Sequence, residues 1–226
     1  MARSDLLDRL LFDEASGALV ASFFALDGPF EGDLLHTLHG NDRDQLTLGD
    51  LFAVTMLDVS VSPRGVRRLL LDDHTRVEVT TLLSDIPDDV DIWDGGAHLA
   101  PDGPAHRLWR LLQREGDGIG PTTAGKILAR KRPRLLPIWD SIVDEIVQQS
   151  GPGLWAAFHA YLQQRARRQR LDHLRPAAGA DAVPRLRMLD ITLWMWGSQA
   201  RVTKKAREAV GLPRAGWRGL SDIVGS

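Results

Sequence analysis

Apolar residues recur at helical spacing along most of the 226-residue chain. In the first half, we expect helices over 4–12, 47–61 and 63–73. Residues 74–86 fit a strand by their β-branched composition and a helix by their short apolar stripe, so both readings stay open. Residues 13–46 show no clear period, and residues 87–103 form an acidic loop rich in Pro and Gly.

Caps, prolines and apolar stripes give a clearer series of helices in the second half. We expect helices over 104–115, 121–131, 140–150, 151–174 and 182–198, followed by the segment RVTKKAREAVGL. Two prolines fix a break at 132–137. The sequence contains neither a convincing series of strands nor a fixed-period repeat. It therefore predicts a mainly α fold.

The loop 87–103 is the best internal boundary, because charge is divided unequally on its two sides. Residues 1–100 hold 7 Lys and Arg against 19 Asp and Glu, whereas residues 101–226 hold 21 against 11. We expect an acidic, mainly helical region at 1–100 and a basic helical region at 101–226, packed as one compact unit. The asymmetry favours a polyanionic partner for the second half, and attraction between the two halves within one fold explains it equally well.

Composition excludes several classes of protein. With 43% hydrophobic and 26% charged residues, the chain is typical of a soluble domain, and no apolar run is long enough to span a membrane. The absence of cysteine excludes disulfides, cysteine nucleophiles and cysteine-bound iron–sulfur clusters. His36 and His39 lack a third ligand at a recognisable spacing, so we expect no metal and no cofactor. The N-terminal segment is not a signal peptide, and we expect a cytoplasmic protein.

The stretch GDGIGPTTAGKIL at 116–128 carries the strongest functional signal. A tight turn between two helices needs backbone torsions that glycine adopts at little cost, and Ile119 between two glycines would point inward and anchor the turn. Pro121 begins the next helix. We expect the main-chain amides of Gly118, Gly120 and the first turn, which includes Thr122 and Thr123, to form a phosphate cradle that reads no base. An ordinary corner between two helices is the alternative for the turn taken alone.

Cationic side chains follow the turn at once. They are Lys126, Arg130, Lys131, Arg132 and Arg134. We expect them to extend a positive surface along the same element toward nucleic-acid phosphates. A solvated basic face without a ligand is the alternative for these charges.

The order of hairpin turn, TA-containing helix, prolyl break and apolar–x–Asp resembles the helix-hairpin-helix DNA glycosylase superfamily of the endonuclease III and MutY type. The resemblance rests on GDGIGPTTA and PIWDSIV and covers about residues 104–150. It implies a two-lobed helical fold with the helix-hairpin-helix at 104–131, and sequence-independent contacts to the DNA backbone. It also implies that Asp140, at the family's spacing from Thr122, is catalytic: beside a flipped nucleotide it would stabilise an oxocarbenium-like state and activate a water.

The sequence departs from the family pattern in three respects. Thr122 stands where bifunctional members carry a Schiff-base lysine, no cysteine is present to bind an iron–sulfur cluster, and DSIV lacks the histidine of DTHV. The resemblance therefore implies a monofunctional DNA N-glycosylase without lyase activity, or a non-catalytic DNA-binding or interaction protein that retains the fold. Asp140 taken alone is equally an N-cap.

Other readings stay open beside this one. DLFAVTMLDVSV, TAGKILARKRPRLLPIWDSIV and MLDITLWMWG also resemble an uncharacterised bacterial family of unknown function. A third functional hypothesis is that the acidic half masks the basic half or mimics DNA toward another protein.

Overall fold

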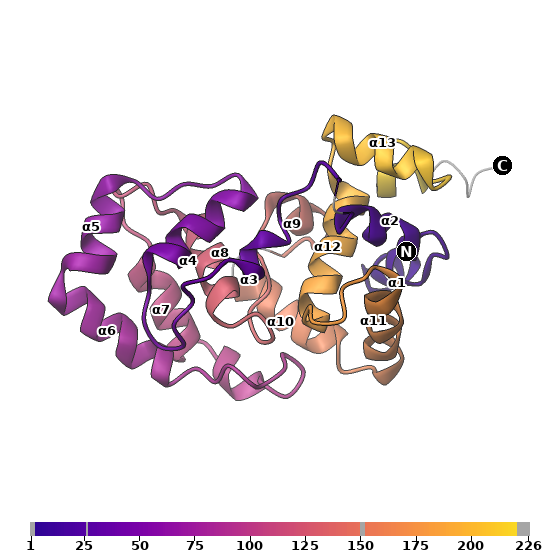
Figure 1. The fold of residues 1–226 in the computed structure, drawn as a ribbon. Coiled ribbons are helices and arrows are strands. Elements are labelled where there is room, and N and C mark those ends of the chain that lie inside the picture. The colour runs from indigo at the N-terminus through magenta and orange to yellow at the C-terminus, as the bar shows by residue number, and fades with distance from the viewer. Residues whose placement is uncertain (1–2, 26, 150–151, 221–226) are drawn as a thin grey trace. The chain divides into compact units, whose positions relative to one another are not determined.

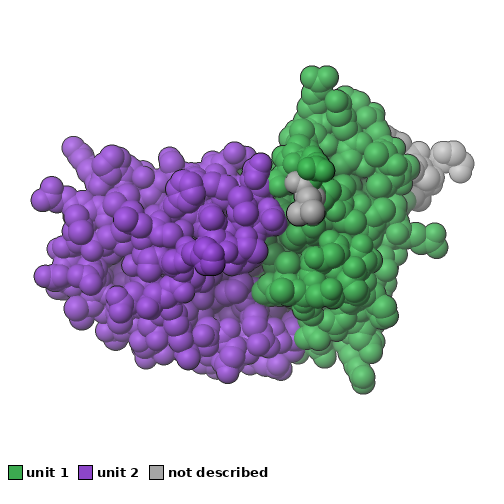
Figure 2. Space-filling view, in the orientation of Figure 1, with its two compact units in different colours: residues 1–30, 140–149, 161–226 green, residues 31–139, 150–160 purple. Residues whose placement is uncertain are grey.

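The structure, a computed structural model, describes residues 3–25, 27–149 and 152–220. Within these ranges the chain forms α- and 3-10 helices and no strand, which confirms the mainly α expectation (Figure 1). The chain divides into two compact units, coloured in Figure 2. Unit 1 comprises residues 1–30, 140–149 and 161–226, and unit 2 comprises residues 31–139 and 150–160.

Unit 2 holds the helices of the middle of the chain. They are α3 (Leu34–Thr37), α4 (Leu48–Ala53), η1 (Val54–Leu57), α5 (Pro63–Leu71), α6 (Asp73–Ser84), η2 (Gly96–Leu99), α7 (Pro104–Leu112), α8 (Pro121–Lys131) and nearly all of α10 (Pro152–Tyr161). Unit 1 holds α1 (Arg3–Phe12), α2 (Ser16–Phe23), α9 (Ser141–Val147), α11 (Arg165–Ala177), α12 (Arg185–Gly197), α13 (Arg201–Ala209) and η3 (Gly216–Leu220).

Several sequence expectations are corrected by these boundaries. The ambiguous segment is the helix α6, and the side chain of Asp72 caps it by accepting from the Thr75 amide at 2.9 Å. The single helix expected over 151–174 is wrong, because the chain turns between α10 and α11. The loop 87–103 lies inside unit 2 and does not separate the two units.

Helix α8 is the central helix of unit 2. Every residue from Thr123 to Lys131 is buried, and the helix packs against α4, η1 and α7. Gly125 permits a close approach, since a Cβ there would lie 2.9 Å from the Cβ of Trp139. On a helix covered on all sides, each polar side chain needs hydrogen-bond partners within the protein, and this requirement applies to the cations of α8.

Helix α12 has the same position in unit 1. Its residues are buried with few exceptions, and it packs against α1, α2, α9 and α11. Gly197 allows α9 to approach, because a Cβ there would lie 2.4 Å from Cγ2 of Ile142. The buried indole of Trp196 donates to Ser16 Oγ at 2.9 Å, which joins α12 to α2.

Buried arginines bind carbonyl groups at the C-terminal ends of helices, where the last carbonyls lack intrahelical partners. Arg68 donates to the carbonyls of Leu111 and Leu112 at the end of α7, at 3.0 and 2.7 Å. Arg207 does the same at the end of α12, where it donates to the carbonyl of Met195 at 2.6 Å. Part of the high arginine content therefore stabilises helix ends within the fold.

None of the helices formed by the described residues combines the length and the apolar character that crossing a membrane requires.

Candidate nucleic-acid interface

The glycine turn between α7 and α8 has the expected geometry at Gly118 but not at Gly120, whose φ of −87° is open to any residue. Gly116 and Gly118 adopt positive φ angles of 86° and 71°, in the left-handed region that favours glycine. Ile119 is 2% exposed, so it anchors the turn to the core of unit 2 as predicted. The amide of Arg114 donates to the Ile119 carbonyl at 3.2 Å and closes the turn.

The turn presents main-chain donors at the start of α8. Gly120 is the extended N-cap residue and Pro121 is the first helical residue. Gly118 and Gly120 are exposed, Thr122 is partly exposed and Thr123 is buried. In the described part of the chain, none of these four residues donates its main-chain N–H to a protein acceptor. The exposed part of this end of α8 has the donors and the dipole orientation that an anion requires.

The expectation that the cations after the turn form a positive surface is wrong for the four that belong to α8 or follow it directly. The exposed fractions are 5% at Lys126, 0% at Arg130, 4% at Lys131 and 0% at Arg132. The ammonium of Lys126 donates to the carbonyl of Leu57, at the end of η1, over 2.7 Å. These side chains face protein because α8 is the covered helix of unit 2, so the structure gives them no surface on which to meet a phosphate.

Arg130 forms a fully buried ion pair. Its Nε lies 3.1 Å from Oδ1 of Asp50, and neither side chain is exposed. The remaining guanidinium nitrogens donate to the carbonyls of Leu35, in α3, and Leu38, its C-cap residue. The guanidinium group thus joins α8 to α3 and α4.

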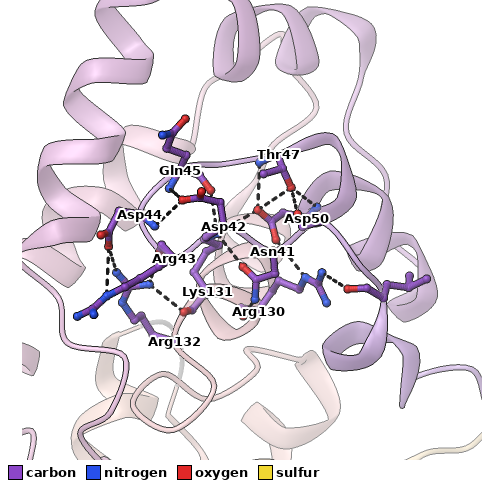
Figure 3. Close-up of polar contacts among 12 residues, drawn as sticks. Asn41, Asp42, Arg43, Asp44, Gln45, Thr47, Asp50, Arg130, Lys131 and Arg132 are labelled. Carbon is purple, nitrogen blue, oxygen red and sulfur yellow. Dashed lines mark hydrogen bonds and ion pairs between the residues drawn. The ribbon is translucent and has the colours of Figure 1, made fainter.

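Lys131 lies in a cage of oxygen atoms supplied by the segment 41–50 (Figure 3). Its Nζ donates to Oδ1 of Asn41 at 2.7 Å, to the Gln45 carbonyl at 2.8 Å and to the Asp42 carbonyl. Oδ2 of Asp50 lies 3.1 Å away. Burial lowers the pKa of Lys131, and the charge and hydrogen bond of Asp50 act in the opposite direction.

Arg132 completes this cluster. Its Nε donates to the carbonyl of Ile86 at 2.6 Å, another guanidinium nitrogen donates to Leu83, and Asp44 forms an ion pair at 3.1 Å. Acids from the first half of the sequence therefore neutralise cations of the second half within unit 2. Of the two explanations for the charge asymmetry, attraction between the halves accounts for these residues.

The exposed cations near the turn come from elsewhere. Arg64 and Arg67 on α5, together with Arg114, line a surface cavity of about 700 Å³ that reaches Gly116, and Asp72, Glu115 and Asp117 line it as well. Arg114 lies in the field of Asp72, whereas Arg64 and Arg67 form no ion pair with any described residue. The sequence predicted no binding role for these arginines. The spacing of Arg64 and Arg67 in PRGVRR, which places both on one helical face, was a signal for such a role.

Helix α5 is locked onto the turn through its own N-terminus. The hydroxyl of Ser62 donates to the Asp117 carbonyl, and Arg68 forms a buried ion pair with the Asp117 carboxylate. A Cβ at Gly65 would lie 3.0 Å from Cδ1 of Ile119 and 3.1 Å from the Asp117 carbonyl oxygen. This interlock fixes the arginines of α5 relative to the glycine turn.

An aromatic pair contacts α8 near its first turn. The rings of Trp109 and Trp139 have centroids 5.5 Å apart and planes tilted by 45°, and both residues are partly exposed. The indole N–H of Trp109 donates to the carbonyl of Pro121 at 3.3 Å, so the pair is joined to the first residue of α8.

Asp140 is the N-cap of α9 in unit 1, as predicted for a structural role. Its Oδ1 accepts from the Ile142 amide at 2.8 Å, and its side chain is partly exposed. The buried Arg187 lies in the field of Asp190 and Asp140. Burial lowers the pKa of Arg187 to about 10, against the opposing effect of these two carboxylates. Asp140 thus carries one of the negative charges that stabilise a buried cation.

No group of three or more His, Asp or Glu side chains within the described ranges is arranged to hold a metal ion. Residues 16–197 match the model of a family described as a family of unknown function (DUF6308). No curated protein and no solved structure matches the chain.

Proposed function

The chain therefore belongs to the family DUF6308, whose function is unknown, and from the geometry of its turn we propose that it binds the sugar–phosphate backbone of DNA. One observation carries the proposal: the exposed main chain of Gly118 and Gly120 leads into α8, and Gly116 of the same turn lines a cavity together with the exposed Arg64 and Arg67. Helix N-terminal amides and arginines are the groups that phosphates bind in proteins. Such contacts position a duplex without reading its bases.

The electrostatic part of this interface consists of Arg64 and Arg67 in place of the buried cations of α8. Each phosphate contact releases counterions, so the logarithm of the affinity falls with the logarithm of salt concentration by about 0.9 per contact. Both arginines project from α5, which Asp117 and Gly65 hold against the turn. We expect them to act together with the turn on neighbouring phosphates.

The test is a salt titration of binding to a fluorescein-labelled duplex of arbitrary sequence, followed by anisotropy. Arg64→Gln and Arg67→Gln are each expected to reduce the salt slope by about 1. Arg76→Gln is the matched control, because Arg76 is an exposed arginine of unit 2 that pairs with Asp73 on α6. An affinity that does not depend on salt, or the same slope for all three variants, contradicts the proposal.

The enzymatic form of the proposal is a monofunctional DNA N-glycosylase of the helix-hairpin-helix type that uses Asp140. Water would add to C1′ of the sugar, the N-glycosidic bond would break with its electron pair leaving on the base, and the carboxylate would take the proton of the water. Two observations support it: the partly exposed position of Asp140 at a helix start and its sequence spacing from Thr122. The non-catalytic alternative requires only the turn.

Base release from duplexes that carry damaged or modified bases separates the two forms. Asp140→Asn and Asp140→Ser both keep a side chain that caps α9, so they remove the carboxylate while retaining the hydrogen bond to the Ile142 amide. In the enzymatic form both variants lose base release and keep their affinity for DNA. If the wild-type protein releases no base from any duplex, the enzymatic form is wrong and backbone binding stands alone.

A further inference from the structure

The indoles of Trp109 and Trp139 form a fixed, partly exposed aromatic surface in unit 2. Trp109 is held by its hydrogen bond to the Pro121 carbonyl, and Trp139 is packed against the bare backbone of Gly125. Other large apolar side chains of the unit are exposed too, such as Leu48 and Phe52, but the two indoles pack against each other and against α8. An ordered indole pair that keeps part of its surface in solvent offers a flat ligand an area of contact at little entropic cost.

This aromatic pair lies next to the proposed backbone-binding turn. Pro121 and Gly125, which the two indoles contact, are four residues apart and so lie on one face of α8. Their separation along the helix axis is about 6 Å, from a rise of about 1.5 Å per residue. A strand whose phosphate is bound at the exposed amide of Gly120 therefore has its bases within reach of the indoles.

We propose that Trp109 and Trp139 form a stacking platform for an unpaired nucleobase. The inference rests on the proposed function and specifies its ligand: DNA that is single-stranded or locally unpaired next to the bound phosphate. Stacking on an aromatic ring accepts any base, because every base has a π face. Paired bases inside a duplex do not offer that face, so the platform discriminates by pairing and not by sequence.

The first test compares the affinity of the full chain for a single-stranded oligonucleotide and for the corresponding duplex. Trp109→Leu and Trp139→Leu are each expected to weaken binding of the single strand about tenfold and binding of the duplex less than about twofold. Trp93→Leu is the matched control. Trp93 is also partly exposed in unit 2, and the neighbouring Ile92 donates to the Arg134 carbonyl beyond the opposite end of α8.

A second test does not depend on the stability of the leucine variants. A duplex with one extrahelical 2-aminopurine is bound to the wild-type protein, and quenching of 2-aminopurine emission reports stacking on an indole. Emission is expected to fall on binding and to recover in Trp139→Leu, whereas Trp139→Phe retains binding of the single strand because phenylalanine also stacks. Unchanged emission at saturation overturns the inference.

The two proposals fail in different ways. If duplex binding keeps its dependence on Arg67 while the tryptophan variants bind single strands as well as the wild type does, the platform is wrong and backbone binding stands. If the wild-type protein binds neither duplex nor single strand, the proposed function is wrong and the platform falls with it.

Discussion

The carboxylate of Asp50 lies 3.1 Å from Nε of Arg130 through one oxygen and 3.1 Å from Nζ of Lys131 through the other. The same side chain closes a capping box with Thr47 at the start of α4. One buried acid thus compensates two buried cations and a helix N-terminus. The basic run that follows the glycine turn therefore stabilises unit 2.

Replacing Asp50 tests this role directly. Asp50→Ala is expected to lower the free energy of unfolding by about 3–5 kcal/mol, because it leaves two buried cations without their counterion. Denaturation in urea, followed by circular dichroism, measures the change. Asp73→Ala is the control: Asp73 belongs to an exposed ion pair with Arg76, and its loss is expected to change stability by less than about 0.5 kcal/mol. Equal effects of the two substitutions contradict the assignment.

The glycine turn could be predicted from the sequence because its constraints are local. Positive φ at Gly118, the inward direction of Ile119 and the start of α8 at Pro121 all follow from neighbouring residues. The N-cap role of Asp140 is local in the same sense. Local chemistry was sufficient at these positions, but it did not reveal the turn between α10 and α11.

The burial of the cations could not be predicted, because their partners are distant in sequence. Asp50 is 80 residues from Arg130, and Arg132 donates to a carbonyl 46 residues away. In the sequence, a run of lysine and arginine on an exposed helix looks the same as one on a buried helix whose cations bind the carbonyls at the ends of other helices. For the same reason the cavity that Arg64, Arg67 and Arg114 help to line could not be predicted, because it depends on the packing of α5 against the turn.

Because α5 packs closely against the turn, methyl groups added at different glycines are expected to lower the stability by different amounts. Gly65→Ala would place Cβ 2.8 Å from Cγ1 of Val61, and overpacking is expected to cost about 1–3 kcal/mol, reduced by the helix preference of alanine. Gly118→Ala is expected to cost about 1–2 kcal/mol, because φ is 71° there.

Gly120→Ala is the matched variant in this series, since its φ is −87° and a Cβ there would meet no atom within 4 Å. Its thermal midpoint is expected to equal that of the wild type, while its affinity for duplex DNA falls because the methyl group occupies the approach to the exposed amides. A large loss of stability in Gly120→Ala would contradict the open geometry of this position.

The stability of unit 1 is expected to depend on acidic pH through Asp8. Burial raises the pKa of this carboxyl group, but hydrogen bonds from Arg167 and Tyr161 outweigh it, so the pKa lies below the ordinary value of 3.8. The ionised group therefore contributes stability above that value and loses its contribution as pH falls through the pKa of the folded state. Asp8→Asn should be less stable than the wild type at pH 7, with the difference shrinking as pH falls below the ordinary value of 3.8.

Unfolding by urea at a series of pH values measures this difference. Glu14→Gln removes an exposed carboxylate from the same unit and is expected to reproduce the pH dependence of the wild type. If Asp8→Asn and the wild type differ in free energy of unfolding by the same amount at pH 7 and pH 2, protonation of Asp8 is not linked to stability.

Substituting a buried cation should change the stability of the protein but not its DNA binding, and substituting an exposed cation should do the opposite. Lys131→Met removes an ammonium that is 4% exposed and leaves several oxygen acceptors without a donor, so it is expected to destabilise unit 2 by about 1–3 kcal/mol. Because no phosphate can reach this group, the folded variant should retain the salt slope of the wild type. Arg67→Gln should do the reverse: the melting temperature stays unchanged and the salt slope falls by about 1. If Lys131→Met reduces the salt slope and leaves stability unchanged, α8 presents its cations to DNA. That result would contradict their burial in the core of unit 2.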